Sequence, residues 1–495
     1  MTLRLTFVQH DRAAGVLLAT ASGDALGVPY EFSSPPGPGE LAVMKGGGLG
    51  PFAPGEWSDD TSMAMAIARV AAAGADLTSA DALDAIAEGF LEWLADDPRD
   101  IGIQTSHVLR STHRRLAPGD SVAEVMSTEA AAYAADHRHS AGNGALMRTA
   151  PVALAHLDDR DHLARAARLV ARLTHADPLA GDSCVLWCEA IRVAVLEDRI
   201  DVPAGLDLLP DSRRAQWATW LDEALTGDLA RFTPNGFTVT ALQAALAAIT
   251  ATPVPAVLPA RHLEDALHAA VRIGDDTDTV AAIAGGLLGA RWGASAVPWT
   301  SRRAVHGWPG CDGRDLVALA TLTVRGGEPD GSGWPLADDV DYGWVAPFAA
   351  VPHPHDPGVL LGNAGTRGHG ADAVVSLCRV GRDQACLDGA EVVVESRLLD
   401  TEDDAADPNV LLELLDAARA VQGLRAEGRT VFLHCVAAEQ RTPSVAVAYS
   451  LLLGHPLEDA RAAVRRALPG ARGRGRVWDA AGDLGEVVPD QSSAP

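Results

Sequence analysis

Two short acidic segments carry oxygen-rich side chains at positions where they could bind a metal ion. The first runs Gly55-Glu56-Trp57-Ser58-Asp59-Asp60-Thr61 before SMAMAIARV, and the second runs Gly274-Asp275-Asp276-Thr277-Asp278-Thr279 before VAAIAGGLLGA. A single acidic residue there would cap a helix, because Asp, Ser and Thr accept hydrogen bonds from its free N–H groups. Two or three adjacent carboxylates repel one another, and a hard cation such as Mg²⁺ or Mn²⁺ offsets that repulsion. We therefore favour metal binding over capping alone.

The composition limits which other functions are plausible. The chain has 495 residues with 47% hydrophobic and 21% charged residues, as in ordinary globular proteins, and its length predicts two domains. A net charge of −26 argues against an extensive nucleic-acid-binding surface. The sequence lacks an apolar stretch long enough to cross a bilayer, and its first residues lack the features of a signal peptide. We expect a cytoplasmic protein that does not bind membranes.

The acidic segments belong to a region whose apolar residues recur at helical spacing. Ala- and Leu-rich helices are expected at 12–30, 61–73, 80–95, 121–135, 162–173, 183–196, 213–226, 238–250, 262–271 and 279–291. Alternating strand patterns are absent there, so residues 1–325 are predicted to form an all-α domain.

The pattern changes after a segment rich in Gly, Pro and Asp, which predicts a linker over 326–345. Short β-branched runs follow near 359–361, 373–377, 391–394 and 430–433, with helices expected at 409–424, 443–453 and 457–467. Strands that alternate with helices predict a small α/β domain over 346–481. The tail 482–495 is expected to be disordered.

Five segments of the first domain resemble the ADP-ribosylglycohydrolase family. They are GDALGVPYEF (23–32), WSDDTSMAM (57–65), GNGALMRTAP (142–151), THADPLA (174–180) and GDDTDTVAAIAGGLLGARWG (274–293), in the order found in the family. The resemblance implies an all-helical fold, an ADP-ribosylated substrate and two Mg²⁺ or Mn²⁺ ions. Asp275 departs from the family, which commonly has Gly there, and it could add charge near the metals or point to solvent.

The resemblance also implies a set of site residues. The metal ligands would be Ser58, Asp59, Asp60, Asp276, Asp278 and Thr279. Two cations can bind the adjacent hydroxyls of ribose and lower the pKa of a water between them. Departure at C1″ passes through an oxocarbenium-like state, so a carboxylate can stabilise charge and accept the proton of that water. Glu31 and Asp60 are both candidates for that catalytic role, and the sequence does not choose between them.

Four further residues are expected near the substrate. Asn143 and Gly144 belong to a tight Gly-Asn-Gly loop whose N–H groups could approach a diphosphate, although such a sequence alone is more often a simple turn. In the family this loop contacts ADP-ribose, with Arg148 close behind, and His175 resembles a histidine near the ligand. All four are predicted substrate-binding residues.

The second domain contains a cysteine in front of a helix. In TVFLHCVAAEQRTPSVAVA (430–448), Cys435 is followed by five residues and then by Arg441-Thr442. This pattern resembles the cysteine-dependent dual-specificity phosphatases. A loop of N–H groups at a helix start binds phosphate and lowers the thiol pKa, and the arginine binds two phosphate oxygens. Cys435 would then attack phosphorus.

The rest of the phosphatase pattern matches only in part. The family's general acid lies some thirty residues before the cysteine, where Asp404 is the best match and Asp403 and Asp407 are neighbours. Ala438 stands where the family usually has Gly, which restricts a loop that needs a positive φ, and Glu439 adds a negative charge beside an anion site. An active phosphatase and an inert or ligand-binding relic both remain open.

Three functions follow from these motifs. The leading hypothesis is metal-dependent hydrolysis of the C1″ bond of ADP-ribose on a protein, nucleic acid or small molecule, with a possible second phosphatase activity. The alternative is a phosphomonoesterase whose larger domain is a regulatory ADP-ribose- or nucleotide-binding module. A non-enzymatic binding protein is a third hypothesis, which the intact acidic segments argue against.

Overall fold

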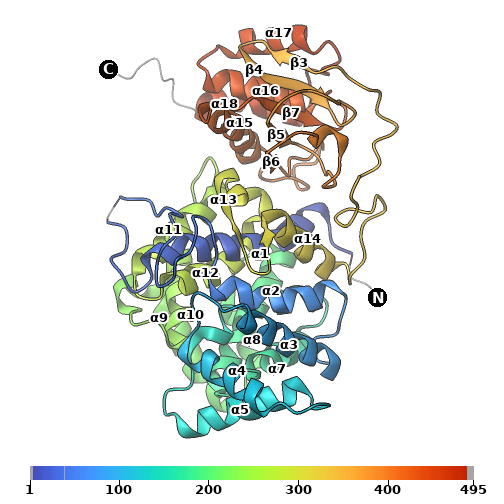
Figure 1. Cartoon of the computed structure of the whole chain (residues 1–495). Coiled ribbons are helices and arrows are strands. Elements are labelled where there is room, and N and C mark those ends of the chain that lie inside the picture. Colours follow the sequence, from blue (N-terminus) through green and yellow to red (C-terminus); the bar gives the residue numbers. More distant parts are fainter. Residues whose placement is uncertain (1–3, 38, 488–495) are drawn as a thin grey trace.

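The computed structural model describes residues 4–37 and 39–487 and contains a large helical domain and a smaller domain with a central sheet (Figure 1). The large domain contains α1 (Phe7–Gly27), α2 (Asp59–Ala72), α3 (Ala80–Ala95), α4 (Ile103–Arg115), α5 (Val122–Asp136), α6 (Ala150–Ala155), α7 (Arg160–Arg172), α8 (Pro178–Glu197), α9 (Asp211–Thr226), α10 (Thr238–Ala251), α11 (His262–Ile273), α12 (Thr277–Trp292), α13 (Trp299–Ala304) and α14 (Gly313–Val324). A short hairpin, β1 (His306–Gly307) and β2 (Cys311–Asp312), precedes α14.

The small domain is built on a five-stranded sheet in the order β3-β4-β7-β5-β6. Its elements are β3 (Val351–His353), β4 (Asp356–Asn363), β5 (Ala373–Ser376), β6 (Val392–Glu395), α15 (Val410–Ala426), β7 (Val431–Cys435), α16 (Arg441–Leu452), α17 (Leu457–Ala467) and α18 (Arg476–Val487). β3 is antiparallel to β4, and the other strands are parallel. Cys435 pairs with Asn363 at the carboxyl edge of this sheet.

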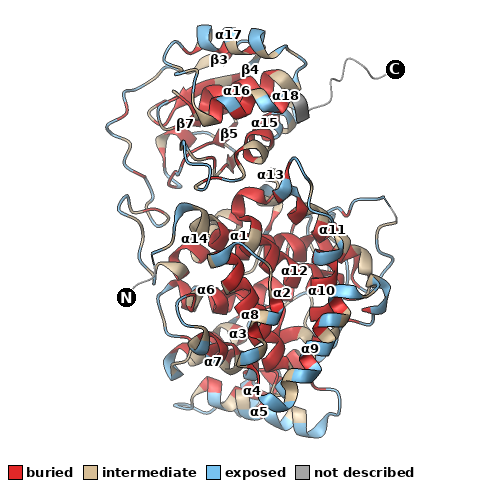
Figure 2. Cartoon of the chain, turned by 180° about the vertical axis from the view of Figure 1, so that it is seen from behind, coloured by how far each residue is buried: buried red, intermediate tan, exposed pale blue. Residues whose placement is uncertain are grey.

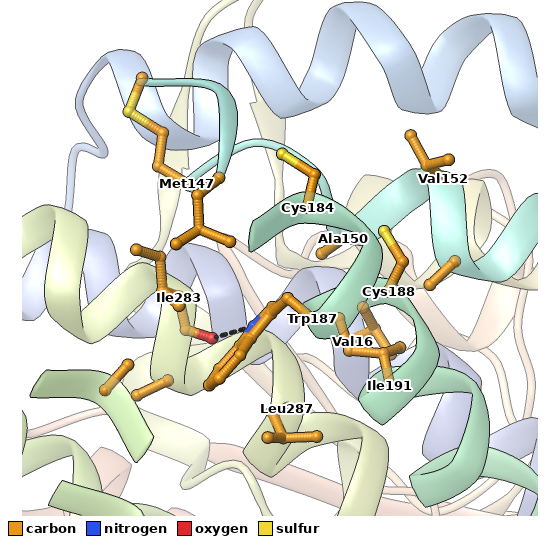
Figure 3. Close-up of a cluster of buried hydrophobic side chains, with 14 of the residues drawn as sticks. Val16, Met147, Ala150, Val152, Cys184, Trp187, Cys188, Ile191, Ile283 and Leu287 are labelled. Atoms are coloured by element: carbon orange, nitrogen blue, oxygen red, sulfur yellow. Dashed lines mark hydrogen bonds between the residues drawn. The ribbon is translucent and has the colours of Figure 1, made fainter. Parts of the chain in front are cut away.

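Each domain has its own hydrophobic core. The core of the helical domain runs from Ala13 to Ala320, and red, buried ribbon dominates its centre (Figure 2). Within it the Trp187 indole donates a hydrogen bond to the carbonyl of Ile283 at 3.0 Å, which ties α8 to α12 (Figure 3). In the small domain, Val375 and Leu433 face α15 and α16, whereas alternate residues of the same strands face the 371–387 segment. Separate cores explain why the chain forms two domains.

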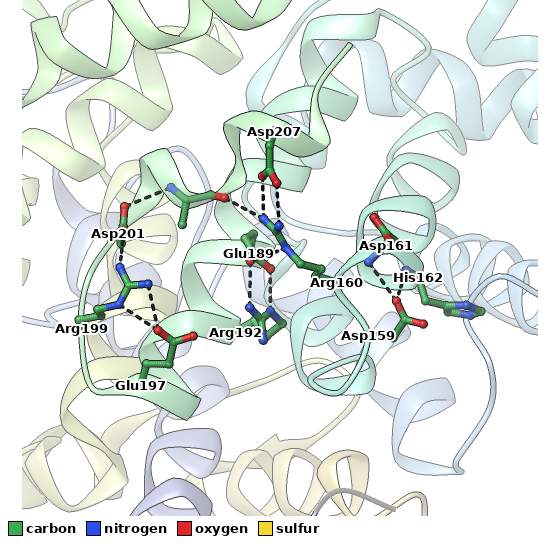
Figure 4. Close-up of polar contacts among 11 residues, drawn as sticks. Asp159, Arg160, Asp161, His162, Glu189, Arg192, Glu197, Arg199, Asp201 and Asp207 are labelled. Carbon is green, nitrogen blue, oxygen red and sulfur yellow. Dashed lines mark hydrogen bonds and ion pairs between the residues drawn. The ribbon is translucent and has the colours of Figure 1, made fainter. Parts of the chain in front are cut away.

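A polar network supports the outer face of the helical domain. Arg160 at the start of α7 forms hydrogen-bonded ion pairs with Glu189 of α8, at 3.0 Å, and with Asp207, at 2.7 Å (Figure 4). Arg192 forms a second ion pair with Glu189 at 2.7 Å. Glu189 is buried, so these arginines neutralise a charge that would otherwise destabilise the packing of α7 on α8.

The two central helices, α1 and α12, run antiparallel with their backbones in close contact. A methyl group on Gly285 would lie 2.1 Å from the carbonyl oxygen of Ala19, and one on Gly289 would lie 2.1 Å from that of Gly15. One on Gly23 would lie 2.1 Å from the carbonyl of Ala281. Glycine is therefore required at these positions by the close approach of the two helices.

The structure confirms the predicted helical domain followed by a small α/β domain, and it adds elements that the sequence analysis did not identify. Helices α4, α6, α13 and α14 were not predicted. α4, with the sequence IQTSHVLRSTHRR, is polar on most of its surface, and α6 and α13 are short. The prediction of a disordered tail is wrong for 482–487, because α18 extends to Val487 and buries Leu484. Residues 488–495 of that predicted tail lie outside the described residues.

Over the described ranges, none of the helices combines the length and apolar character that crossing a bilayer requires.

Replacing Gly285 by alanine tests the contact between α1 and α12. We expect Gly285→Ala to destabilise the helical domain by about 1–3 kcal/mol, because the added methyl group overlaps the Ala19 carbonyl and forces the helices apart. Gly181 in α8 is the matched control, since a methyl group there meets only the side chain of Arg168 at 3.5 Å.

Urea unfolding followed by circular dichroism measures the difference between the two variants. Gly181→Ala should be neutral, or stabilising by up to about 1 kcal/mol, because alanine favours a helix more than glycine does. Equal stabilities of the two variants would show that the backbone contact is not limiting.

Candidate functional site

The two acidic helix starts meet in the interior of the helical domain. Ligand atoms of Asp24, Asp60 and Asp278 lie within 4.8 Å of one another, and so do those of Glu31, Asp276 and Asp278. Asp278 belongs to both groups, so five carboxylates from α1, the turn after it, α2 and α12 form one buried cluster. The contact between α1 and α12 brings these segments together although they lie some 250 residues apart.

Asp24 was not identified from the sequence. Its Oδ1 accepts hydrogen bonds from the backbone N–H and the hydroxyl of Ser58, both at 2.8 Å, and its Oδ2 accepts one from the N–H of Thr61 at 2.9 Å. It therefore satisfies free N–H groups at the start of α2, the task that a capping residue normally performs. The Ser58 hydroxyl also donates to Oδ2 of Asp60 at 2.9 Å. These contacts fix the first turn of α2, so Asp59 and Asp60 are not needed to cap the helix.

Burial and mutual repulsion strongly raise the pKa values of carboxyl groups in and beside the cluster. Burial, followed by the neighbouring carboxylates, raises the pKa of Asp59, Asp60 and Asp278 well above the ordinary value, and the pKa of Glu31 to about 9. The Oδ1 atom of Asp60 is buried and has no hydrogen-bond partner among the described residues. Buried carboxylates this close need a positive partner or protons. An oxygen-only set with an unpaired atom fits hard divalent cations such as Mg²⁺ or Mn²⁺.

Two asparagines hold the α12 side of the cluster. The Asn143 amide donates to Oδ2 of Asp276 at 2.7 Å, and Oδ1 of Asn235 accepts the N–H of Asp276 at 2.9 Å. Asn235 is fully buried and was not identified from the sequence, since nothing nearby in the chain singles it out. Thr279 favours the ionised form of Asp276, although burial raises the pKa of that carboxyl. The predicted residue Asn143 therefore orients a carboxylate of the cluster.

The departure at Asp275 now has a structural explanation. Its φ of +66° lies in the left-handed region, which accounts for the glycine that the family commonly has there. Its carboxylate accepts the backbone N–H of Asn235 at 2.7 Å, and its carbonyl accepts the N–H of Phe32 at 2.7 Å. Asp275 thus joins the loop before α12 to Asn235 and to the residue after Glu31.

The remaining predicted substrate residues lie beneath the Gly-Asn-Gly loop. His175 is 2% exposed, and a methyl group on Gly144 would lie 2.9 Å from its ring. Arg148 is fully buried; it donates to the hydroxyl of Thr174 at 2.7 Å and stacks on Phe90 at 4.5 Å. Burial lowers the pKa of Arg148 to about 10. His175 therefore packs against the loop, Arg148 contacts Thr174 next to it, and both side chains are buried.

A cleft opens beside the cluster. It has a volume of about 720 Å³, within the usual range of small-molecule sites, and is lined by residues that include Ser58, Asp59, Trp93, Asp100 and Trp308. Asp100, which was not identified from the sequence, lies close enough to accept a hydrogen bond from the protonated carboxyl of Glu31, and burial raises the pKa of Asp100. The cleft is therefore lined by two predicted metal ligands, Ser58 and Asp59, and by Asp100, a neighbour of the predicted catalytic residue Glu31.

In the small domain, the loop 436–440 connects β7 to α16, as the pattern predicts. Cys435 ends β7 and is 3% exposed, and Arg441 opens α16. Ala438 has a φ of +59°, so the loop does adopt at this residue the conformation that glycine favours. Glu439 pairs with Arg472 at 3.0 Å, which compensates the charge expected to oppose phosphate. Ala438 therefore adopts a positive φ without a glycine, and the charge of Glu439 is paired.

The predicted general acid, Asp404, pairs with Arg476 and, among the described residues, not with the loop that follows Cys435. The side chain of Asp404 is 92% exposed and pairs with Arg476 at 2.5 Å, so no contact among the described residues holds it toward the loop. Its neighbour Asp407 is buried and hydrogen-bonds Glu413, and burial raises its pKa. Asp404 therefore stays a prediction as the acid, and that role would require its ion pair with Arg476 to open.

Comparisons with known proteins cover both domains. The model of the ADP-ribosylglycohydrolase family matches residues 7–330. The ADP-ribosyl-[dinitrogen reductase] glycohydrolase of Rhodospirillum rubrum is 30% identical over 302 residues, which cover 59% of this chain and 90% of that protein. The ADP-ribosylarginine hydrolase Tri1 of Pseudomonas putida is 27% identical over 292 residues, covering 58% and 72%. Among solved structures, human DUSP28 is 19% identical and covers 29% of this chain and 97% of that one, with a TM-score of 0.25.

Burial of His434 predicts a loss of stability in acid. Burial lowers the pKa of this histidine from 6.5 to about 3, so it is neutral in the folded chain but protonates near pH 6.5 when unfolded. The stability that the neutral, buried His434 side chain provides is fully present above pH 6.5 and is lost as the pH falls toward 3. Between pH 6 and 4 the free energy of unfolding should drop by about 1.4 kcal/mol per pH unit for this residue.

Urea unfolding at several pH values measures that slope. His434→Gln should flatten it, whereas the same change at the exposed His113 should leave it unaltered. An unchanged slope in His434→Gln would contradict the assignment.

Proposed function

The chain belongs to the ADP-ribosylglycohydrolase family, and we propose that its helical domain hydrolyses the C1″ glycosidic bond of ADP-ribose with two divalent cations bound at the carboxylate cluster. The observation that carries this proposal is the pair of carboxylate groups that share Asp278, one of which contains Asp60, whose buried Oδ1 has no hydrogen-bond partner among the described residues. Mg²⁺ or Mn²⁺ held there would supply Lewis acidity for the ribose hydroxyls and for a water. Ser58, Asp59, Asp60, Asp276, Asp278 and Thr279 are the proposed ligands.

Asp24, Asn143 and Asn235 are proposed as positioning residues. Both oxygens of Asp24 already accept hydrogen bonds from the start of α2, and the two asparagines hold the carboxylate and the N–H of Asp276. Such partners fix the orientation of ligand side chains and are often nearly as important as the ligands themselves.

Glu31 is the better candidate for the catalytic carboxylate. Asp60 is fully buried and its Oδ2 accepts the hydroxyl of Ser58, which suits a ligand. Glu31 follows the turn after α1 and hydrogen-bonds Asp100 on the wall of the cleft. Cations bound at the cluster would favour the ionised form of Glu31, whose pKa is otherwise raised to about 9 by burial and by neighbouring carboxylates. We propose that the Glu31 carboxylate then accepts the proton of the attacking water while the water oxygen bonds to C1″ and the bond to the acceptor breaks.

ADP-ribosylated arginine is the first acceptor to test. The two relatives described above are named for ADP-ribosylated dinitrogen reductase and ADP-ribosylarginine. The cleft of about 720 Å³ beside Asp59 has room for a ligand of nucleotide size. Serine-linked and nucleic-acid-linked ADP-ribose complete the set of substrates that separates the three acceptor classes.

Replacing Asp60 tests the metal mechanism. Asp60→Ala should lower release of ADP-ribose by more than roughly 100-fold in Mg²⁺ or Mn²⁺, because the cluster loses a buried carboxylate that lies within 4.8 Å of those of Asp24 and Asp278. Asp81 is the matched control, since it also stands in the first turn of an Ala-rich helix but is exposed. Asp81→Ala should release ADP-ribose at the parental rate.

Calorimetric titration with Mn²⁺ separates binding from catalysis. Asp60→Ala should weaken Mn²⁺ binding, whereas Glu31→Gln should lower turnover by a larger factor than it weakens Mn²⁺ binding. Full release activity in Asp60→Ala would refute the metal mechanism. If no variant or substrate gives release while phosphate monoesters are hydrolysed, the alternative of a regulatory helical domain would be favoured instead.

Hydrolysis of phosphate monoesters is a second candidate function, carried by the small domain. It is supported by the position of Cys435 and Arg441 on either side of a loop that tolerates a positive φ at Ala438. The Cys435 thiolate would form an S–P bond as the P–O bond breaks, with an acid protonating the leaving oxygen. Water would then displace the thiolate and release phosphate.

Exchange of Cys435 for serine tests this second activity. Cys435→Ser should abolish hydrolysis of an aryl phosphate, while Cys311→Ser, at a half-buried cysteine of the other domain, should have no effect. Equal rates in the parent and Cys435→Ser would exclude a cysteine phosphatase. Neither variant should alter release of ADP-ribose.

A further inference from the structure

A cavity lies between the two domains and is lined from both sides. The carboxyl ends of β5 and β6 face α13 and α14 across this seam (Figure 1). The cavity has a volume of about 130 Å³, and its lining includes parts of α13 and α14 together with residues 377–379 and 393–399. Cys435 is not among the lining residues, but Arg441 is.

The charge of this cavity is opposite to that of the chain. Its lining contains six arginines and one carboxylate, Glu395, in a chain of net charge −26. The arginines are Arg302, Arg303 and Arg314 of the helical domain and Arg379, Arg397 and Arg441 of the small domain. The chain contains far more acidic than basic residues, so a random set of lining residues would contain more carboxylates than arginines.

Ion pairs to residues outside the cavity hold most of these arginines. Arg302 pairs with Asp416 at 2.7 Å and Arg397 with Asp11 at 2.5 Å, and both contacts cross the seam. Arg303 and Arg379 pair with Glu427 and Asp330. None of these four carboxylates lines the cavity. A guanidinium has five N–H donors, so donors remain available after each pair has formed.

Arg441 differs from the other five. Within the described part of the chain it has no carboxylate partner, and it donates only to the carbonyls of Leu377, at 2.5 Å, and Leu398, at 3.3 Å. The Nε atoms of Arg441 and Arg302 are buried without a hydrogen-bond partner among the described residues. Unpaired buried donors of this kind are costly unless an acceptor binds to them.

Arginines of the seam add to the effect of burial on the pKa of two nearby groups. Burial lowers the pKa of His10 to about 4, with Arg325, Arg397 and Arg379 adding to the effect. Burial, with Arg397 and Arg325, also lowers the pKa of Arg379, although Asp330 lies beside it. A dianion would be attracted to this region.

The apolar part of the lining limits the kind of anion. Leu18, Val317 and Val393 lie among the arginines, so an organic group has a surface to contact. The volume of about 130 Å³ suits one phosphoryl group and excludes a whole dinucleotide, so a substituent as large as a sugar has to extend out of the cavity. We propose that this cavity binds a phosphate monoester, whose phosphoryl oxygens accept hydrogen bonds from arginines of both domains.

The proposal concerns binding and does not depend on turnover at Cys435 or at the carboxylate cluster. It is tested in the full chain carrying Cys435→Ser, so that a bound monoester is not consumed. Calorimetric titrations at constant ionic strength compare inorganic phosphate, ribose 5-phosphate and ribose. We expect ribose 5-phosphate to bind at least as tightly as phosphate, and ribose not to bind.

Two arginine variants distinguish binding in the cavity from a general effect of altering the contact between the domains. Arg314 lines the cavity and also contacts Glu395 and the carbonyl of Val380. Arg382 pairs with Asp312 and Asp315 across the same seam but does not line the cavity. Arg314→Gln should weaken ribose 5-phosphate binding by about tenfold or more, the effect of one charge-assisted hydrogen bond, whereas Arg382→Gln should change it less than about twofold.

Thermal unfolding of each variant confirms that both domains remain folded. Absence of ribose 5-phosphate binding in the Cys435→Ser chain would overturn the proposal. Unchanged affinity in Arg314→Gln, or an equal loss in Arg314→Gln and Arg382→Gln, would overturn it as well, because the cavity would then not be the binding site.

Discussion

The close contact between the backbones of α1 and α12 is the constraint on which the rest of the structure depends. Gly15, Gly23, Gly285 and Gly289 let the two helices approach until a single methyl group would overlap a carbonyl oxygen. Only at this distance can Asp24 at one end of α1 face the start of α12 and hold the start of α2 as well. The packing of small residues, which carries no chemistry itself, therefore sets the geometry of the carboxylates.

The same contact creates an electrostatic problem that a bound cation would resolve. Five carboxylates share one buried region, and burial together with their mutual repulsion raises their pKa values. Hydrogen bonds from Ser58 and Asn143 offset part of that cost and fix the orientation of individual carboxylate oxygens, and Asn235 accepts the backbone N–H of Asp276. Local stability is thus reduced where metal binding is proposed, as is common at functional sites.

The seam between the domains shows the opposite arrangement of charge. There arginines gather around a small cavity, and their carboxylate partners, such as Asp11 and Asp416, lie at its margins and belong to the other domain. These ion pairs add to the apolar contacts between the domains, where Leu258 and Trp299 of the helical domain pack against the core of the small domain. The segments that follow β5 and the end of β6 consequently face the helical domain across this cavity.

Short-range sequence patterns determined much of the fold and of the candidate sites. Local rules identify the two acidic helix starts, the loop between Cys435 and Arg441, and the change from helical to α/β periodicity, because each is contiguous in the chain. The polar α4 gave no such signal. Asp24, Asn235 and Asp100 were missed because their roles arise from contacts with residues tens to hundreds of positions away. Tertiary structure alone decided that Arg148 is buried, that Asp404 pairs with Arg476, and that arginines of two domains meet. The physical reason is that a side chain's type sets which interactions it can make, whereas the packing of distant segments sets which partners it meets.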